Sequence, residues 1–184
     1  MQINQLPNRP LFEHQSNYAL NVIKEFNMHE AKELSIPIDK MNSIDQDKEL
    51  KQTGDQIPYR QAVGCLLFLS TVTRPDAAYA VSYVGRFLSE PKQVHWSMVK
   101  PNLRYLKRTN NYGLCLDSTK QLCMEIFSDA EFANCVQTKR STSGYVFRHQ
   151  STIISWTSHR QQTVALSTTE SEYIAACEAI KSMI

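Results

Sequence analysis

The chain has 184 residues, enough for one ordinary domain or two small ones, and 42% of them are hydrophobic, as in typical globular proteins. Its net charge is only +2, from 20 basic and 18 acidic residues, so bulk charge gives no argument for nucleic-acid binding. The longest apolar run, at 63–69, is far shorter than the roughly 20 residues that span a bilayer, and no secretion signal is visible, so we expect a soluble intracellular protein with five reduced cysteines.

The first predicted element is a short amphipathic helix at 16–27. Its apolar residues recur at i, i+3, i+4 and i+7, namely Ala19, Val22, Ile23 and Phe26. Residues 33–58 are poor in apolar side chains, mixed in charge and end in a proline. This segment therefore indicates a linker or a long loop.

Three further helices are predicted in the rest of the N-terminal half. The first begins at Tyr59, and the second and third cover 73–88 and 95–109, each with one apolar face. Pro101 lies inside the stripe of the third helix, where a proline costs about 3 kcal/mol or forces a kink.

Gly113 separates this helical half from a region of short strands. Three β-branched and aromatic segments, separated by polar turns, predict an antiparallel meander: 122–129, 143–149 and 152–158. A helix follows from Ser167. The fold class is therefore α/β, with a helical unit at 1–112 and a β-β-β-α unit at 113–184.

Asp129 stands at the end of the first of these strands. A side chain there can face a cleft while its backbone stays in the sheet. An aspartate in this position is also typical of a turn or of a helix N-cap. The pattern alone leaves both interpretations open.

Glu170 is the second candidate carboxylate. On a helical projection it lies on the face that we expect to pack on the sheet, together with Tyr173, Ile174 and Cys177. A carboxylate on that face would be partly buried, which is unfavourable unless a cation offsets it. A structural alternative is a helix capping box, formed either by Ser167 and Glu170 or by Thr169 and Glu172.

Two carboxylates at one edge of a sheet favour a divalent metal. Mg²⁺ accepts few protein carboxylates, keeps several waters and takes other ligands from substrate phosphates. A pair of such ions, about 3.5–4 Å apart, holds the attacking and leaving oxygens of a phosphodiester displacement. Asp129 and Glu170 are the two candidate ligands, fewer than such a site normally has.

Three basic patches are candidates for phosphate contacts that do not read base sequence. They comprise Lys100, Arg104, Lys107 and Arg108 in the predicted helix 95–109, Lys139 and Arg140 after the first strand, and Arg160 after the third. The alternative for any one patch is an ordinary solvated surface.

Several ordered stretches resemble the Pol polyprotein of copia-type LTR retrotransposons: YRQAVGCLLFLSTVTRPDAAYAVSYVGRFLSEPKQVHWSMVKPNLRYLKRT, FSDAEFANC, RSTSGYVF and ISWTSHRQQTVALSTTESEY. The resemblance covers nearly the whole chain in order. It implies that 1–112 corresponds to the C-terminal and connection region of a reverse transcriptase. Residues 113–184 then correspond to the N-terminal part of a ribonuclease H-like domain.

The resemblance also implies roles for single residues. The SDAE motif makes Asp129 a catalytic metal ligand, and STTESEY does the same for Glu170. The implied reaction is Mg²⁺-dependent hydrolysis of RNA in RNA–DNA hybrids. The implied partners are an RNA–DNA hybrid or DNA and the remainder of the Pol polyprotein, with no membrane. Glu131 and Phe132 stand where family members usually have Asp and Trp.

Two features of the family are missing from the sequence. There is no Asp-Asp dipeptide, so the polymerase site implied by the family lies upstream, and the chain ends at Ile184, before the later carboxylates. We therefore expect a truncated Pol fragment with negligible hydrolysis on its own, and whether it is an enzyme stays open. The alternatives are a non-catalytic nucleic-acid-binding module and a functionless relic of a transposable element.

Overall fold

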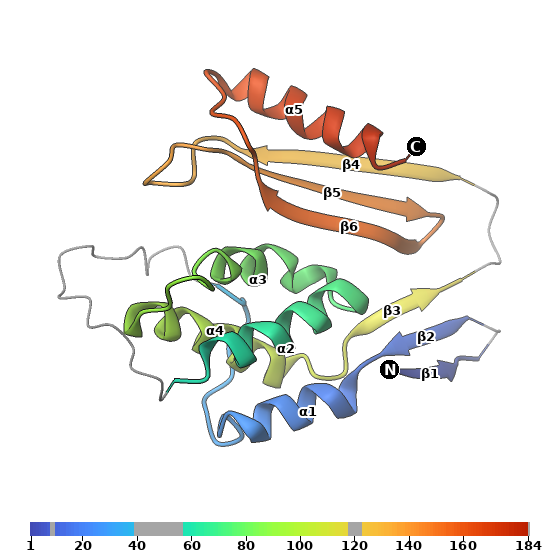
Figure 1. The fold of residues 1–184 in the computed structure, drawn as a ribbon. Helices are drawn as coiled ribbons and strands as arrows, with labels where there is room; N and C mark the ends of the chain where they lie inside the picture. Colours follow the sequence, from blue (N-terminus) through green and yellow to red (C-terminus); the bar gives the residue numbers. More distant parts are fainter. Residues whose placement is uncertain (8–9, 39–56, 118–122, 184) are drawn as a thin grey trace. The chain divides into compact units, whose positions relative to one another are not determined.

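A computed structural model of the chain describes residues 1–7, 10–38, 57–117 and 123–183. It has the predicted fold class, with a helix-rich N-terminal half followed by three antiparallel strands and a helix (Figure 1). Most of the predicted linker at 33–58 lies outside the described residues. No helix within these ranges is both long and apolar enough to cross a membrane.

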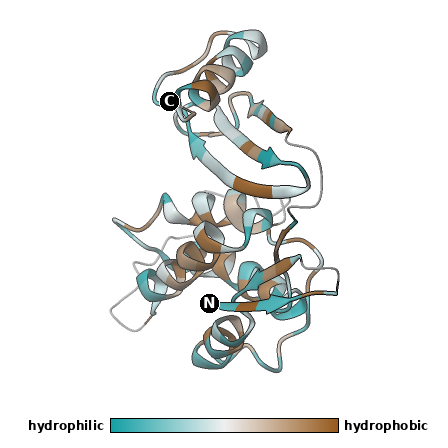
Figure 2. Ribbon diagram, turned by 90° about the vertical axis from the view of Figure 1, so that its right-hand side faces the viewer, coloured by the Kyte–Doolittle hydropathy of each residue, from teal (hydrophilic) through white to brown (hydrophobic). Residues whose placement is uncertain are grey.

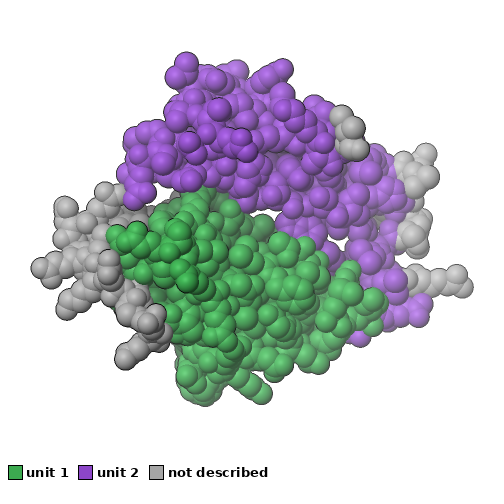
Figure 3. Space-filling view, viewed as in Figure 1, with its two compact units in different colours: residues 1–3, 13–113 green, residues 4–12, 114–184 purple. Residues whose placement is uncertain are grey.

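The chain forms two compact units (Figure 3). The first, here the helical unit, contains residues 1–3 and 13–113, and the second, here the sheet unit, contains residues 4–12 and 114–184. Their assignment to a reverse transcriptase region and a ribonuclease H-like region stays a prediction.

All four helices predicted in the N-terminal half are present. They are α1 (Ser16–Glu25), α2 (Tyr59–Val72), α3 (Ala78–Gly85) and α4 (Gln93–Arg108). The predicted helix at 73–88 is split, because the 3₁₀ turn η2 (Pro75–Ala77) precedes α3. A proline at the start of that turn suits a chain that enters a helix, since its missing N–H would be unpaired there in any case.

The core of the helical unit lies between the apolar faces of these helices. Figure 2 shows hydrophobic residues gathered along them. Side chains from α2, α3 and α4 are fully buried there, among them Val63, Val81, Val84, Val99 and Leu103. Each such side chain contributes about 1.5–3 kcal/mol, so the helical unit has a core of its own.

Pro101 does not end α4. The helix continues from Gln93 to Arg108, and Asn102, which is buried beside the proline, donates from its side-chain amide to the Met98 carbonyl (3.0 Å). This bond supports the helix backbone next to the position where proline has no N–H to donate.

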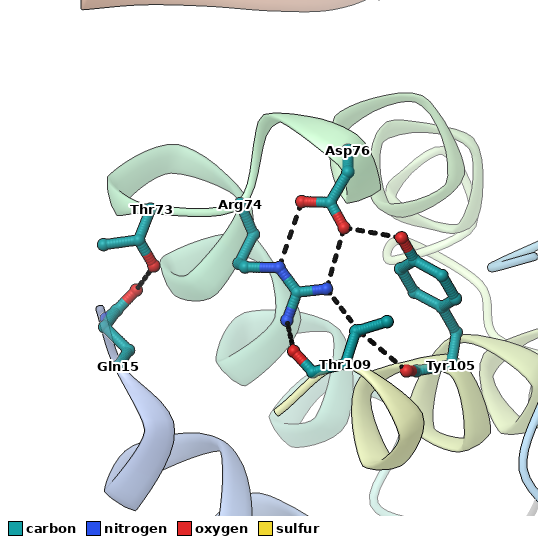
Figure 4. A network of polar contacts seen from close by, with 6 residues as sticks. All are labelled: Gln15, Thr73, Arg74, Asp76, Tyr105 and Thr109. Carbon is teal, nitrogen blue, oxygen red and sulfur yellow. Dashed lines mark hydrogen bonds and ion pairs between the residues drawn. The ribbon is translucent and has the colours of Figure 1, made fainter. Parts of the chain in front are cut away.

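A polar cluster in the helical unit ties the segment before α3 to the end of α4 (Figure 4). The buried Arg74 donates from Nε and Nη2 to the two oxygens of Asp76 (3.0 and 2.7 Å) and from Nη1 to the Thr109 carbonyl (2.9 Å). The Tyr105 hydroxyl also donates to Asp76 (2.7 Å). Burial by itself raises the pKa of Asp76, but the hydrogen bonds and charge of Arg74, together with Tyr105, outweigh it and lower the pKa. Burial and the contact with Asp76 raise the pKa of Tyr105 to about 12.

A small sheet that was not predicted contains β1 (Gln2–Gln5), β2 (Leu11–His14) and β3 (Gly113–Leu116), in that order. Gly113 is required by its close approach to the backbone of β2. A Cβ at this position would lie 2.2 Å from the Glu13 carbonyl oxygen and 2.8 Å from the His14 Cβ. Any other residue would therefore force β3 away from β2.

The sheet unit contains the predicted meander of β4 (Met124–Glu131), β5 (Thr142–His149) and β6 (Thr152–Arg160), followed by α5 (Thr168–Lys181). All neighbouring strands are antiparallel, in the order β4-β5-β6. Helix α5 packs on β4 and β5 and runs opposite to β4, so the last residues of β4 and the first turn of α5 lie at the same end of the unit (Figure 1).

The face that α5 turns to the sheet differs from the prediction. Its buried residues are Ser171, Ala175 and Ala179, whereas Tyr173 is 72% exposed and Glu170 is also exposed. Small side chains at i, i+4 and i+8 let the helix backbone lie close to the strands, and the larger apolar side chains point elsewhere. The predicted packing face was therefore wrong by roughly 150°, about two fifths of a turn.

Candidate metal and nucleic-acid site

Asp129 lies in β4, opposite Gly144 of β5, and its side chain is exposed. Because side chains alternate along a strand, it shares a sheet face with Phe127 and Glu131. The other face carries Ser143 and is the one covered by α5, as the contacts of Gln161 described below show. Asp129 is thus a strand residue near the end of β4, and its cross-strand partner, Gly144, has no side chain.

Glu170 lies in the first turn of α5. The helix is capped by Ser167, whose Oγ accepts the Glu170 backbone N–H (3.1 Å). The Glu170 carboxylate in turn accepts the Leu166 N–H through Oε2 (2.6 Å). The arrangement at Ser167 is therefore half of the predicted capping box, because the Glu170 carboxylate accepts the N–H of Leu166 in place of that of Ser167. A cap role for Glu170 leaves its other oxygen, Oε1, without a hydrogen bond in the described parts of the chain.

Gln161 connects the surroundings of these two carboxylates, and the sequence did not single it out. It is fully buried, and its Nε2 donates both to Ser143 Oγ and to the Ser171 carbonyl, each at 2.9 Å. Ser143 is paired with Ala130, the neighbour of Asp129, and Ser171 follows Glu170. In sequence, Gln161 stood in a polar run with Arg160, which offered no sign of burial.

The loop after β4 is held by a polar cluster next to Asp129. Asn134 donates to Glu131 (3.0 Å), and Thr142 donates to Asn134 (2.8 Å). Glu131 is therefore engaged in ordering the loop between β4 and β5.

Arg160, one of the candidate phosphate contacts, lies beside a thiol. Its Nη1 is 3.7 Å from the Sγ of Cys135, in the loop between β4 and β5. Burial by itself raises the pKa of Cys135, but hydrogen bonds from Thr138 and from Arg160, with the Arg160 charge, lower it to about 7. Of the other candidates in this loop, Lys139 is exposed with a φ of 54°, and Arg140 is half-buried.

The basic stripe on α4 is only partly free for phosphate. Arg104 donates from Nε to the Lys32 carbonyl, and Lys107 donates from Nζ to the Ala31 carbonyl (3.0 Å). These two side chains hold the segment after α1 against α4. Lys100 and Arg108 are exposed.

The site consists of two carboxylates whose neighbours are connected by Gln161. Both present hard oxygen ligands of the kind that Mg²⁺ prefers. Among the residues that the structure describes, no group of three or more His, Cys, Asp and Glu could hold a metal ion. Asp129 and Glu170 thus lie at the same end of the sheet unit, with Asp129 on the sheet face that α5 does not cover.

Comparison with known proteins places this geometry in context. The chain is 38% identical, over 99% of its length, to the retrovirus-related Pol polyprotein from transposon TNT 1-94 of Nicotiana tabacum, of which it spans 14%. It is 44% identical over 70% of its length to the secreted RxLR effector protein 161 of Plasmopara viticola, covering 90% of that protein. An uncharacterized mitochondrial protein of Arabidopsis thaliana is 37% identical over 90% of the chain, which covers 68% of it. No family model matches the chain, and no solved structure does.

Proposed function

Because the chain belongs to the retrovirus-related Pol polyproteins of copia-type transposons, we propose that it takes part in reverse transcription through a ribonuclease H-like sheet unit. In this proposal Asp129 and Glu170 bind Mg²⁺ for the hydrolysis of RNA in RNA–DNA hybrids. The chain spans only about a seventh of the tobacco Pol polyprotein, so the activity of the whole polyprotein is proposed here for one segment of it.

The observation that carries the proposal is the arrangement of β4 and α5. The strand with Asp129 ends where the helix with Glu170 begins, and Gln161 bridges residues adjacent to both carboxylates. This placement brings the two carboxylates to the same end of the sheet unit, although they lie 41 positions apart in the sequence and Asp129 projects from the sheet face that α5 does not cover.

The roles of the two side chains follow from their surroundings. Asp129 is exposed, and its cross-strand partner Gly144 has no side chain. Glu170 is held through Oε2 by the Leu166 N–H, so its Oε1 is the oxygen available to an ion. When bound, Mg²⁺ activates water and stabilises the leaving oxygen of the phosphodiester. Since only two carboxylates are in place, we expect hydrolysis by the 184-residue chain alone to be negligible.

The proposal is tested by metal binding rather than by turnover. Mn²⁺ added to the full chain is expected to broaden the NMR signals of both Asp129 and Glu170, and Asp129→Asn or Glu170→Gln should weaken this at least about tenfold, because each removes a charged ligand. Glu172→Gln is the matched control, since it changes an exposed carboxylate on the same helix. Broadening that both ligand variants leave unchanged would contradict the proposal.

Hydrolysis of an RNA–DNA hybrid provides the second measurement. Negligible cleavage by the chain alone is the expected result. Robust cleavage that disappears in Asp129→Asn would support the role of Asp129 as a metal ligand, but it would refute the expectation that the chain alone is inactive.

A second candidate function is a non-catalytic nucleic-acid-binding module. It is favoured by the short relatives of which the chain covers 68% and 90%, because they contain this region outside a long polyprotein. The exposed Lys100 and Arg108 on α4 would then contact phosphates. Nucleic-acid affinity that falls steeply with salt and is indifferent to Asp129→Asn would support this function over the first.

A further inference from the structure

Gln161 lies between β6 and α5, and its buried side chain hydrogen-bonds both the sheet and the helix. Its backbone N–H donates to the Ser141 carbonyl (2.9 Å), which continues the pairing of β5 and β6 by one step. Its side chain then turns to the face covered by α5. There Nε2 reaches Ser143 Oγ and the Ser171 carbonyl, each at 2.9 Å.

The two acceptors are adjacent to the candidate metal ligands. Ser143 is the cross-strand partner of Ala130, which follows Asp129, and Ser171 follows Glu170. One amide group therefore connects β5, the strand paired with the Asp129 strand, to the helical turn that carries Glu170. A second contact between β6 and α5, from His159 Nε2 to Glu178 Oε2 (3.2 Å), lies about two turns further along the helix and does not orient its first turn.

Glutamine is not the residue that would stabilise the fold most at position 161. Its Oε1 has no hydrogen-bond partner in the described ranges, although the residue is fully buried. A buried acceptor without a partner is destabilising, and a leucine of similar size would remove it. Leucine would not provide the two donated hydrogen bonds. The specific contribution of glutamine at this position is therefore the geometry that these two bonds impose on the sheet and the helix.

We propose that Gln161 is a positioning residue that holds the first turn of α5 against the end of the sheet and so sets the placement of Glu170 relative to Asp129. This inference rests on the proposed metal site for its purpose. The bridge itself is a separate claim and can be measured without metal.

The experiment compares three variants of the full chain: Gln161→Leu, Ser143→Ala and Gln162→Leu. The first removes both bonds of the bridge, and the second removes only the acceptor on the sheet and changes a single buried hydroxyl. The third is the matched control, because Gln162 is the exposed neighbour and undergoes the same substitution.

The first readout is amide hydrogen exchange without metal. In Gln161→Leu the amides of Leu166 and Glu170, which form the cap of α5, should exchange about tenfold faster relative to those at the centre of the helix. Ser143→Ala should show a smaller change of the same kind, and Gln162→Leu should match the unmodified chain. Equal exchange at the cap in all four proteins would overturn the proposal, and so would uniformly faster exchange along α5, which indicates general destabilisation. If Gln161→Leu does not fold, Ser143→Ala decides between these outcomes.

The second readout is Mn²⁺ broadening, which a purely structural role would leave unchanged in a folded variant. In the unmodified chain the signals of Asp129 and Glu170 should broaden together. In Gln161→Leu we expect about tenfold more Mn²⁺ to be needed for Glu170, with Asp129 less affected, as is typical when a residue that orients a ligand is lost. Unchanged Mn²⁺ dependence in a variant with a loosened cap would overturn the positioning role. Absence of broadening in the unmodified chain would instead refute the metal site, while the exchange data would still decide whether the bridge exists.

Discussion

Among single residues, Cys135 shows how strongly neighbours set the chemistry of a side chain. All five cysteines are free thiols, and Cys115 and Cys123 are more exposed than Cys135. Exposure alone would make those two the most reactive. Although burial by itself raises the pKa of the Cys135 thiol, hydrogen bonds from Thr138, followed by the hydrogen bond and charge of Arg160, outweigh it and lower the pKa to about 7, so near neutral pH a large share is thiolate, the reactive form.

We therefore expect Cys135 to be alkylated by iodoacetamide faster than the other cysteines at pH 7, with a rate that rises to half its maximum near that pH. Arg160→Met should move the midpoint to higher pH and slow the reaction at pH 7, since the cation no longer stabilises the thiolate. Mass spectrometry of each cysteine peptide measures both effects. Lys139→Met, which removes an exposed cation from the same loop, is the control, and an equal effect of both variants would contradict this explanation.

Among the elements, α4 has an unusual N-terminus. The Lys92 N–H donates to Nδ1 of His95 (3.0 Å), so a histidine ring takes the place of the usual carboxylate in closing the first turn. The ring stacks on Phe87 at 4.0 Å between centroids and also lies near Tyr59. Burial, followed by the nearby charge of Lys92, lowers the pKa of His95, while Glu90 acts in the opposite direction.

This geometry predicts how stability depends on pH. A histidine whose pKa is lowered on folding binds its proton more tightly in the unfolded chain, so its contribution is complete above the ordinary value of 6.5 and is lost as pH falls below it. Protonation also removes the acceptor that Nδ1 offers to Lys92. Denaturant unfolding between pH 7.5 and about 5 should show this loss, and His95→Gln, whose amide can still accept the bond, should reduce the slope. His29→Gln, an exposed histidine of the same unit, should leave the slope unchanged, and a slope that His95→Gln preserves would refute the assignment.

On the scale of the whole molecule, single buried polar side chains join segments that lie far apart in the sequence. In the helical unit, Arg74 connects the end of α2 to Thr109, 35 residues away, and carries its charge at 3% side-chain exposure. It is neutralised by Asp76 and lies over the ring of Tyr105 at 5.6 Å. In the sheet unit, Gln161 has the corresponding role between strands and helix. Each unit therefore contains a buried polar group that joins distant segments, in addition to its apolar packing.

Asp76→Asn is expected to destabilise the helical unit by roughly 2–3 kcal/mol, because it leaves the buried Arg74 guanidinium without its counter-charge. Glu33→Gln, an exposed carboxylate of the same unit, should change stability by less than about 0.5 kcal/mol. Urea denaturation followed by circular dichroism measures both. Equal effects of both variants would contradict the role of the ion pair.

The effect of Asp76→Asn should also depend on pH. Since the pKa of Asp76 is lowered on folding, its contribution to stability is present above the ordinary value of 3.8 and is lost as pH falls below it. The difference in stability between Asp76→Asn and the unmodified chain should therefore shrink in acid.

Much of the architecture could be predicted from local patterns. The spacing of apolar residues located the four helices of the first half, and β-branched segments located β4, β5 and β6, because periodicity records which side of an element is buried. Family resemblance pointed to Asp129 and Glu170. Two kinds of feature were not predicted. The strands β1, β2 and β3 have only four residues each, too few to show a pattern, and the need for glycine at Gly113 arises only from the approach of β2.

The sequence by itself determined the fold class and the order of the four N-terminal helices, β4 to β6 and α5, since these depend on residue type and local spacing, and the family resemblance added the candidate carboxylates. Only the tertiary structure decided which face of α5 meets the sheet, because close packing selected the small Ser171, Ala175 and Ala179 over the larger apolar side chains. It also decided that Gln161 is buried between sheet and helix and that Arg104 and Lys107 hold the backbone of a neighbouring segment. A polar side chain looks the same in sequence whether water or a distant carbonyl satisfies it, and that choice is made only when the chain has folded.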